Sequence, residues 1–382
     1  MTNEYNYDIK SLASAATGGT VTTVGNYRIH TFTSSGTFIV NKAMNVEYLV
    51  MGGGGGGGAD HGGGGGAGEL RYNSSYAISP GNKTITIGAG GHGAPAGVRG
   101  ASYVGGNGDS TVFGDITSIG GGGGGTVAAP AQVGATGACG GGSSVYNIVG
   151  GTGSKHYNGG NSSTGYGSSG GGGVGGIGGN STTSPTNAHS SGGVGGTGTS
   201  VYSALLITAN AGIDISGTRW IGGGGGGCYA ITANNGGSGG GGAGSIYGGA
   251  WSVAGTNNTG SGGGGGLSYI ETNSSGAIGG SGIVIIRYLS SYDVTATNIT
   301  VTPSESPCRT GTCTIGVSVT WTNNASSASV SDLSITVGNG SSTISPPSYP
   351  SISFAANETK GPYTFTVSNM IVGTHSICPN PN

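Results

Sequence analysis

The sequence VEYLVMGGGGGGG, residues 46–58, joins a strand-like stretch directly to a run of glycines. Apart from Glu47, its first six residues are apolar or aromatic, which is typical of a half-buried strand. The reverse order occurs in GGSGIVIIRY, residues 279–288, where glycines lead into an apolar strand. We expect these two strands to share one sheet, because each must bury an aliphatic face. The long segment between them is then an insertion that the sheet closes at its base.

Most of the 93 glycines lie in that insertion, in runs separated by polar stretches. The runs are Gly52–Gly58, Gly62–Gly66, Gly120–Gly125, Gly140–Gly142, Gly170–Gly173, Gly222–Gly227, Gly239–Gly242 and Gly262–Gly266. Glycine is unfavourable in α-helices and has no side chain to pack in ordinary strands. The runs favour an extended threefold helix like polyproline II, bonded to its neighbours through the backbone. We predict an ordered bundle of such polyglycine-II helices; a flexible linker is the alternative.

Other stretches predict the remaining strands of the base. They are YRIHTFT (27–33), TFIV (37–40), KTITIG (83–88) and GIVIIRYL (282–289). The first two are separated by Ser-Ser-Gly and predict a hairpin. We place a polar N-terminal arm, rich in Thr and Val, at residues 1–25 and the glycine-rich domain at 26–290.

Residues 291–382 change character. Alternating β-branched stretches separated by Asn, Gly and Pro turns predict short strands every 8 to 12 residues, an arrangement typical of an immunoglobulin-like sandwich. Trp321 is expected in its core. A seventh strand is missing from this prediction, because the chain ends in CPNPN. The whole chain is therefore predicted to be all-β, with a glycine-helix bundle, a small sheet at its base and a C-terminal sandwich.

Charged residues make up only 6% of the 382 residues, and the formal net charge is −2. Such a chain has no field to attract nucleic acid or an anionic membrane. Acid–base catalysis needs ionisable groups, so an enzyme is not expected. No cofactor is predicted. The first residues, MTNEYNYDIK, lack the basic and apolar regions of a signal peptide, and no apolar stretch is long enough to insert into a membrane.

The opening strand VEYLVMGGGGGGG, then KTITIGAGG (83–91), the GGSGGGG block (236–242) and the closing GGSGIVIIRY resemble a glycine-rich domain of bacteriophage tail-fibre and receptor-binding proteins. The resemblance covers residues 26–288. It implies a polyglycine-II sandwich whose polar loops contact the host. Residues 292–382 resemble, less specifically, the CARDB and immunoglobulin-like modules of prokaryotic and archaeal surface proteins.

Tyrosine is the main aromatic residue, with 18 copies. A rigid apolar face with a polar group suits contacts to sugars or proteins. The alternative is that these rings cover the ends of the glycine bundle. The candidate binding residues between glycine runs are Tyr157, Tyr166, Tyr202, Trp220, Tyr229, Tyr247, Trp251 and Tyr269.

Five cysteines favour disulfides and an extracellular setting. Cys313 has two candidate partners, Cys308 in a tight loop and Cys378 across the sandwich. Cys139 and Cys228 each adjoin a glycine run and are candidates to pair with one another. The odd count leaves one thiol free or intermolecular. Their spacing is not that of a zinc site.

Ten Asn-x-Ser/Thr sequons are candidate glycosylation sites if the protein is secreted or archaeal. They begin at Asn73, Asn82, Asn161, Asn180, Asn257, Asn273, Asn298, Asn324, Asn339 and Asn357. Asp60–His61 is the densest polar pair between two runs. We interpret it as a polar loop tip, and no metal site is predicted. Ser238 matches the nucleophile-elbow pattern only because glycine is so frequent.

Two functions fit these patterns. The first is a fibre protein of a virion, whose loops bind a glycan or protein of the host surface. The second is an extracellular filament subunit, in which the N-terminal arm completes the sandwich of the next identical subunit by donor-strand exchange. Both place the protein on a virion or cell surface.

Overall fold

The computed structural model describes two units, one formed mainly by residues 29–287 and the other mainly by residues 288–382. The described residues are 15–25, 27–96, 104–127, 132–146, 148–183, 191–229, 234–269 and 272–289, together with the backbone of the strands between 294 and 380. Within them, no helix is long and apolar enough to cross a membrane. The only α-helix among these residues is α1 (Ser203–Thr208), so the described chain is nearly all β.

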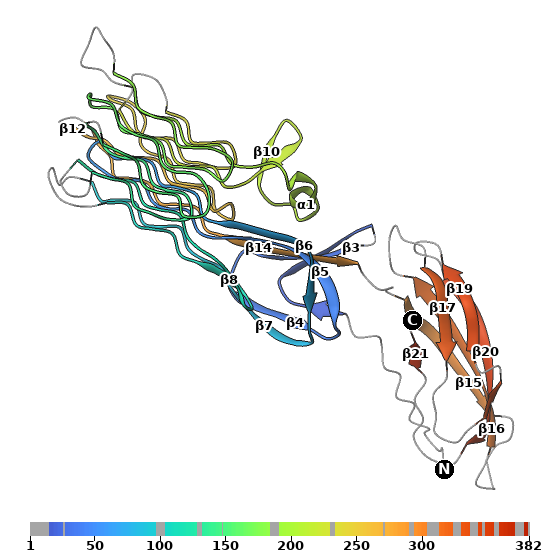
Figure 1. Ribbon diagram of the computed structural model, residues 1–382. Helices are drawn as coiled ribbons and strands as arrows, with labels where there is room; N and C mark the ends of the chain where they lie inside the picture. Colours follow the sequence, from blue (N-terminus) through green and yellow to red (C-terminus); the bar gives the residue numbers. More distant parts are fainter. Residues whose placement is uncertain are drawn as a thin grey trace. The chain divides into compact units, whose positions relative to one another are not determined.

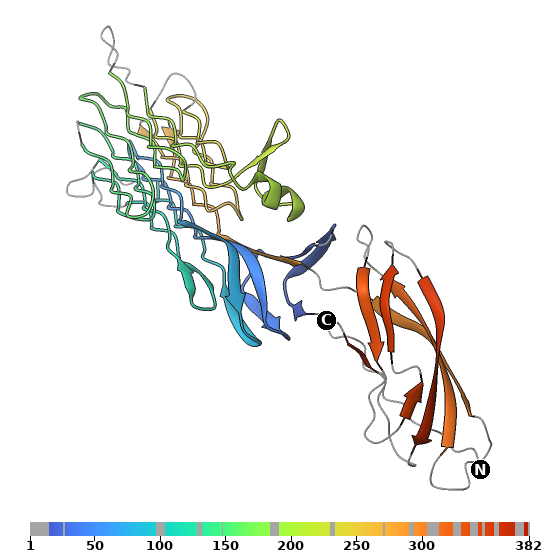
Figure 2. The same cartoon turned by 45° about the vertical axis from the view of Figure 1, so that its right-hand side comes forward.

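Two five-stranded sheets form the base of the first unit (Figures 1 and 2). One has the order β1 (Ala16–Thr17), β4 (Gly36–Val40), β7 (Gly81–Thr86), β8 (Thr111–Phe113) and β9 (Ile116–Ser118). The other has the order β2 (Thr20–Val24), β3 (Tyr27–Phe32), β14 (Ile283–Leu289), β5 (Met44–Met51) and β6 (Leu70–Ile78). Strands β1 and β2, which lie within the predicted N-terminal arm of residues 1–25, belong to these sheets.

Strand β14 closes the insertion as its sequence predicts. It pairs antiparallel with β5, and the register places Ile283 opposite Met51 and Arg287 opposite Glu47. The predicted hairpin of residues 27–33 and 37–40 is wrong, because β3 and β4 lie in different sheets. The chain crosses between the sheets here, which lets Phe32 pack edge-on against Phe38 with ring centroids 6.3 Å apart.

An insertion at the sheet end of the glycine runs supplies a second layer of the core. It consists of α1, β10 (Ile213–Ile215) and β11 (Thr218–Trp220). Leu205 and Leu206 of α1 join a buried cluster with residues of β3, β5, β6 and β14. The apolar face of α1 is therefore buried against the second sheet, which explains why so short a helix is stable.

The backbone hydrogen bonds of the run Gly52–Gly58 follow a repeat of three residues. Its successive N–H groups donate in rotation to three antiparallel segments, in the pairs Gly53 to Asp109, Gly54 to Gly280, Gly55 to Gly66, Gly56 to Gly106, Gly57 to Ala277 and Gly58 to Gly63. Its carbonyls accept in rotation from three parallel segments, through the N–H groups of Gly91 and Ala94, of Gly121 and Gly124, and of Gly263 and Gly266. The run is thus bonded to neighbours on all sides, which leaves no space for side chains. A Cβ on Gly55 would overlap the carbonyl of Gly122.

The C-terminal unit contains two antiparallel sheets. The first has the order β15 (Val294–Pro303), β16 (Cys313–Asn323), β20 (Thr359–Met370) and β18 (Thr343–Ser345). The second has the order β19 (Ser348–Phe354), β17 (Val330–Thr336) and β21 (Cys378–Asn380). The expectation that CPNPN forms no strand is wrong, because Cys378 pairs with Thr336 and Asn380 with Ser334. Pro379 is tolerated because β21 ends the order of its sheet.

Candidate binding site at the distal end of the glycine runs

The turn at residues 59–61 marks the end of the bundle opposite the sheets. The chain leaves β5 through Gly52–Gly58, reverses at this turn and returns through Gly62–Gly66 to β6. Other runs turn at the same end, and Figures 1 and 2 show their loops gathered there. We call it the distal end.

Five aromatic rings from different turns meet at the distal end. We call them the distal aromatic cluster. The ring centroids are 5.3 Å apart for His61–Tyr229, 5.7 Å for His61–Tyr166, 6.0 Å for Tyr166–Tyr229, 6.0 Å for Tyr146–Tyr166 and 5.9 Å for Tyr229–Tyr247. Residues up to 186 positions apart in sequence, from His61 to Tyr247, are therefore brought together. The rings are tilted or edge-on rather than stacked flat, as aromatic side chains prefer.

The cluster has a buried floor and an exposed rim. Tyr229 is 7% exposed and His61 is 6% exposed, whereas Tyr146, Tyr166 and Tyr247 are 49%, 43% and 41% exposed. The floor fixes the positions of the rim rings, and the rim presents phenol groups and ring faces to solvent. Such a surface combines apolar contact area with hydrogen-bonding groups at little cost in side-chain entropy.

Unfavourable backbone conformations are concentrated at this cluster. Asp60, His61, Tyr146 and Tyr229 have positive φ angles of 51°, 59°, 69° and 68°. Side chains with a Cβ rarely adopt these angles, and each costs about 1–3 kcal/mol. The surrounding backbone packing holds the residues there. Strain that is retained at one place in a structure is typical of a functional site.

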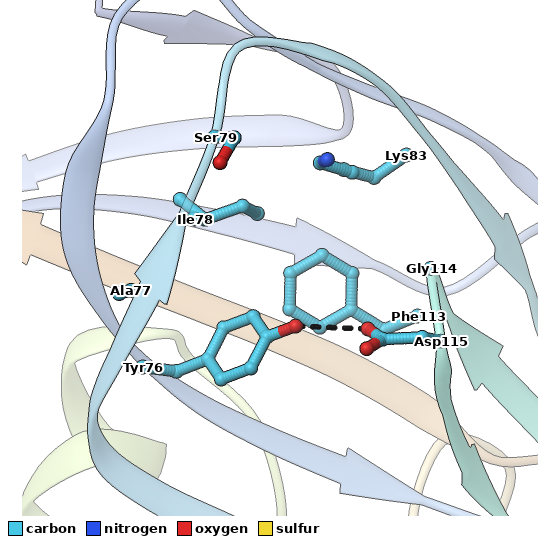
Figure 3. A pocket seen from close by; sticks show the side chains of 8 residues that line it. All are labelled: Tyr76, Ala77, Ile78, Ser79, Lys83, Phe113, Gly114 and Asp115. Carbon is cyan, nitrogen blue, oxygen red and sulfur yellow. Dashed lines mark hydrogen bonds between the residues drawn. The ribbon is translucent and has the colours of Figure 1, made fainter.

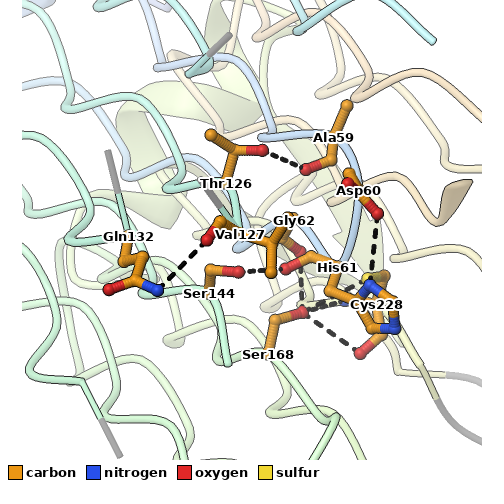
Figure 4. A network of polar contacts seen from close by, with 10 residues as sticks. All are labelled: Ala59, Asp60, His61, Gly62, Thr126, Val127, Gln132, Ser144, Ser168 and Cys228. Atoms are coloured by element: carbon orange, nitrogen blue, oxygen red, sulfur yellow. Dashed lines mark hydrogen bonds and ion pairs between the residues drawn. The ribbon is translucent and has the colours of Figure 1, made fainter. Parts of the chain in front are cut away.

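Hydroxyl groups fix the turns at the distal end (Figure 4). Thr126 donates to the Ala59 carbonyl at 2.7 Å, Ser144 to the His61 carbonyl at 2.8 Å and Ser168 to the Gly62 carbonyl at 2.7 Å. Each of these residues lies within two positions of a glycine run in the sequence.

Asp60 and His61 form a buried pair at the floor of the cluster. The carboxylate Oδ1 of Asp60 lies 3.3 Å from Nδ1 of His61, and both residues are almost fully buried. The pair lies in the turn at residues 59–61, as the interpretation as a polar loop tip predicts, and both side chains are buried there. Within the described part of the chain, no group of three His, Cys, Asp or Glu side chains is placed to hold a metal ion.

Five of the eight predicted aromatic residues lie at one or the other end of the bundle. Tyr166, Tyr229 and Tyr247 belong to the distal aromatic cluster, together with His61 and Tyr146, which are not among the predicted candidates. Tyr202 packs against Tyr72 of β6 at 4.5 Å, and Trp220 lies in β11, so these two serve the sheet end.

The other three candidates lie outside the described ring contacts of the cluster. Tyr157 and Trp251 are 43% and 66% exposed. The backbone of Tyr269 pairs with Thr272, joining β12 (Ser268–Tyr269) to β13 (Thr272–Asn273).

The predicted bond between Cys139 and Cys228 is not formed, since both are free, buried thiols. Burial raises the pKa of each thiol to about 12. The Sγ atom of Cys228 lies 3.4 Å from the hydroxyl oxygen of Ser168. Cys308 lies outside the described residues. The backbone places Cys313 in β16 and Cys378 in β21, in different sheets, and their pairing stays a prediction.

The five sequon asparagines with described side chains are exposed or half-buried. The amide oxygen of Asn161 accepts from the Gly150 N–H at 2.9 Å, and that of Asn180 accepts from the Asn161 N–H at 2.8 Å. These two side chains thus satisfy backbone groups of outer runs. Asn82 and Asn257 are exposed and Asn73 is half-buried. Asn298 lies in β15 and Asn273 in β13, and Asn324, Asn339 and Asn357 lie outside the described residues.

Sheets at the base, glycine runs above them and aromatic turns at the far end define a glycine-rich structural domain. Residues 33–289, more than half of the chain, match the model of the family described as "Glycine-rich domain". The chain belongs to this family. No curated protein matches it.

Proposed function

We propose that this is a non-enzymatic adhesive fibre protein whose distal aromatic cluster binds a glycan or protein of a host surface, as in a phage tail fibre. The observation that supports this most is the cluster itself, with three half-exposed tyrosines on a strained, buried floor. Aromatic residues surrounded by Ser, Gly and Asn are typical of adaptable binding surfaces.

The glycine runs are well suited to act as a rigid support for such a surface. We propose that they are polyglycine-II helices, which is supported by the three-residue repeat of hydrogen bonds along Gly52–Gly58. Backbone groups bonded throughout the bundle hold the distal turns in fixed positions without using charged side chains. The seven strands in the described part of the C-terminal unit support an immunoglobulin-like module.

A catalytic role is not part of the proposal. Burial raises the pKa of Cys228 to about 12, so its thiol stays protonated at neutral pH. Asp60 and His61 lie close to this thiol (Figure 4). The sequence contains few charged residues, which also supports binding of the host surface through ring faces and hydrogen bonds rather than through ion pairs. A virion or cell surface is the setting that such a protein requires.

The filament alternative depended on a sandwich without its last strand and on a free N-terminal arm. Strand β21 occupies the place of the missing strand, and β1 and β2 pair within their own chain. The filament function stays the alternative proposal.

The test is binding of the purified chain to envelopes and glycan arrays of candidate hosts, with and without the triple substitution Tyr146→Ala, Tyr166→Ala and Tyr247→Ala. We expect binding to fall by at least 100-fold, because aromatic anchors contribute most of the energy of such contacts. Tyr157→Ala is the matched control, since Tyr157 is 43% exposed and makes no described contact with the cluster. Equal binding by the triple variant and the control would refute the proposal.

A further inference from the structure

The depression in the base between β6 and the turn that joins β8 to β9 is open to solvent (Figure 3). Its Ser79 and Asp115 side chains are exposed, and the Tyr76 hydroxyl already donates to Asp115 at 2.8 Å. These groups select no ligand. The glycine bundle instead carries a reactive pair of residues on its surface.

Asn-Gly is the dipeptide in which asparagine most readily loses its side-chain amide, because glycine has no Cβ to obstruct its own backbone nitrogen. It occurs at Asn107–Gly108, Asn158–Gly159, Asn235–Gly236 and Asn339–Gly340. The last of these pairs lies outside the described residues. The other three asparagines are all exposed, so access to solvent does not distinguish them.

The hydrogen bonds of the reacting groups do distinguish them. In this reaction the backbone nitrogen of the glycine attacks Cγ of the asparagine, and a hydrogen bond that holds either group opposes it. At Asn107, Oδ1 accepts from the Gly123 N–H at 2.9 Å and Nδ2 donates to the Thr136 carbonyl at 3.3 Å. The Gly108 N–H donates to the Gly121 carbonyl at 2.9 Å. Both reacting groups are therefore restrained.

The pair at Asn158 is restrained in the same way. Its Oδ1 accepts from the Gly153 N–H at 2.8 Å. The Gly159 N–H donates to the Gly151 carbonyl at 3.0 Å. Neither the attacking nitrogen nor the side chain can move without breaking a hydrogen bond.

The pair at Asn235 lacks these restraints. Within the described part of the chain, neither the Asn235 side chain nor the Gly236 N–H forms a hydrogen bond. Closing the ring requires the Asn235 carbonyl to turn, and this carbonyl accepts from the Gly195 N–H at 2.9 Å. The carbonyl of Asn158 accepts from the Gly178 N–H at 3.0 Å, so this restraint is common to both pairs.

We propose that Asn235 is a site of spontaneous succinimide formation. The Gly236 nitrogen bonds to Cγ of Asn235 and loses its proton, and the side-chain amide nitrogen takes up a proton and leaves as ammonia. Water then opens the ring at either carbonyl and leaves aspartate or isoaspartate. The reaction needs no reagent besides water. The proposal does not depend on the function of the distal end.

Isoaspartate at this position changes the path of the run. Asn234 is 4% exposed and donates from Nδ2 to the Gly227 carbonyl at 2.8 Å, and the Gly237 N–H donates to the Gly224 carbonyl at 2.8 Å. Isoaspartate adds one carbon atom to the backbone between these two anchors, so both bonds cannot keep their register. Aspartate adds only a negative charge.

The test is peptide mass spectrometry of the full chain during incubation in mildly alkaline buffer, with and without guanidinium chloride. The described Asn-Gly pairs are internal controls for one another. In the native protein we expect loss of the amide at Asn235 to be faster by about tenfold or more than at Asn107 or Asn158, where the bonds of both reacting groups must break first. In guanidinium chloride the three rates should be similar.

Asn235→Gln is the matched variant, because its longer side chain cannot close the five-membered ring. It should abolish the product at this position and leave the rates at Asn107 and Asn158 unchanged. Equal native rates at the three pairs, a faster rate at Asn107 or Asn158, or an Asn235 that keeps its amide for as long as the denatured chain needs to lose it would each overturn the proposal.

The variant Asn235→Asp separates the charge from the extra backbone carbon. We expect the incubated protein to melt at a lower temperature than Asn235→Asp, because only the incubated protein contains isoaspartate. Equal melting temperatures would overturn the expected change in the path of the run.

Discussion

Glycine is required in the runs because of what surrounds it rather than because of its backbone angles. Gly55 donates to Gly66 and accepts from Gly263, while a Cβ at this position would overlap the Gly122 carbonyl. The neighbouring runs cannot move apart without breaking their own hydrogen bonds. A single methyl group therefore disturbs several segments at once.

The first prediction concerns this contact. Gly55→Ala should lower the free energy of unfolding by about 3 kcal/mol or more, at the upper end of overpacking in a close-packed interior. Gly36→Ala is the control, because its Cβ would meet only Phe32, at 4.0 Å, and should change the stability by less than about 1 kcal/mol. Chemical denaturation of both variants measures the difference. Equal losses would mean that close approach is not what selects glycine in the runs.

The second prediction concerns the free thiols. Cys139 and Cys228 are buried, and their pKa of about 12 leaves almost no thiolate at pH 8. Iodoacetamide should leave both unmodified in the native protein and modify both in guanidinium chloride without reductant. Peptide mass spectrometry distinguishes this from a disulfide, which would stay unmodified in the denaturant as well.

At the scale of elements, the contact between His156 and β6 connects a turn at the sheet end to a base strand. The Nε2 atom of His156 accepts from the Leu70 N–H at 3.1 Å. Desolvation by burial lowers the pKa of His156 below 6.5, and the nearby Glu69 partly opposes this. The neutral ring is therefore the form that stabilises the start of β6.

The third prediction is a pH dependence that follows from this pKa. Because the folded-state pKa lies below the unfolded value of 6.5, the contribution of His156 is complete above pH 6.5 and is lost as the pH falls toward the lowered value. His156→Phe removes the acceptor and should cost about 1–3 kcal/mol at pH 7.5. Denaturation curves between pH 7.5 and 4.5 should show the gap to wild type closing as the pH falls. A constant gap would contradict this role.

The place of each base strand depends on its pattern of aliphatic residues and on the strand with which it pairs. The run of buried residues in β14, from Ile283 to Ile286, could be predicted because only a sheet closed by both ends of the insertion buries it. The pairing of β3 and β4 could not, because the sequence around Ser34 allows either a hairpin or a crossing between sheets. Packing of Phe32 on Phe38 accompanies the crossing.

At the scale of the whole molecule, each of the two units has its own hydrogen-bonded sheets. Units of this kind usually unfold as separate cooperative transitions. The fourth prediction is that scanning calorimetry of the full chain resolves two transitions. Gly55→Ala should shift one of them and leave the other in place. A single transition that moves as a whole in this variant would show that the chain unfolds as one unit.

The sequence alone determined that the chain is nearly all β, that glycine runs fill an insertion and that residues 282–289 return to close it. These features follow from local composition, because runs without side chains can pack only through their backbone and apolar strands must be buried. Only the tertiary structure decided that His61, Tyr146, Tyr166, Tyr229 and Tyr247 meet and that Cys139 and Cys228 stay apart as thiols. The physical reason is that the order in which the runs pack side by side depends on backbone hydrogen bonds, and these bonds are chemically the same for every glycine.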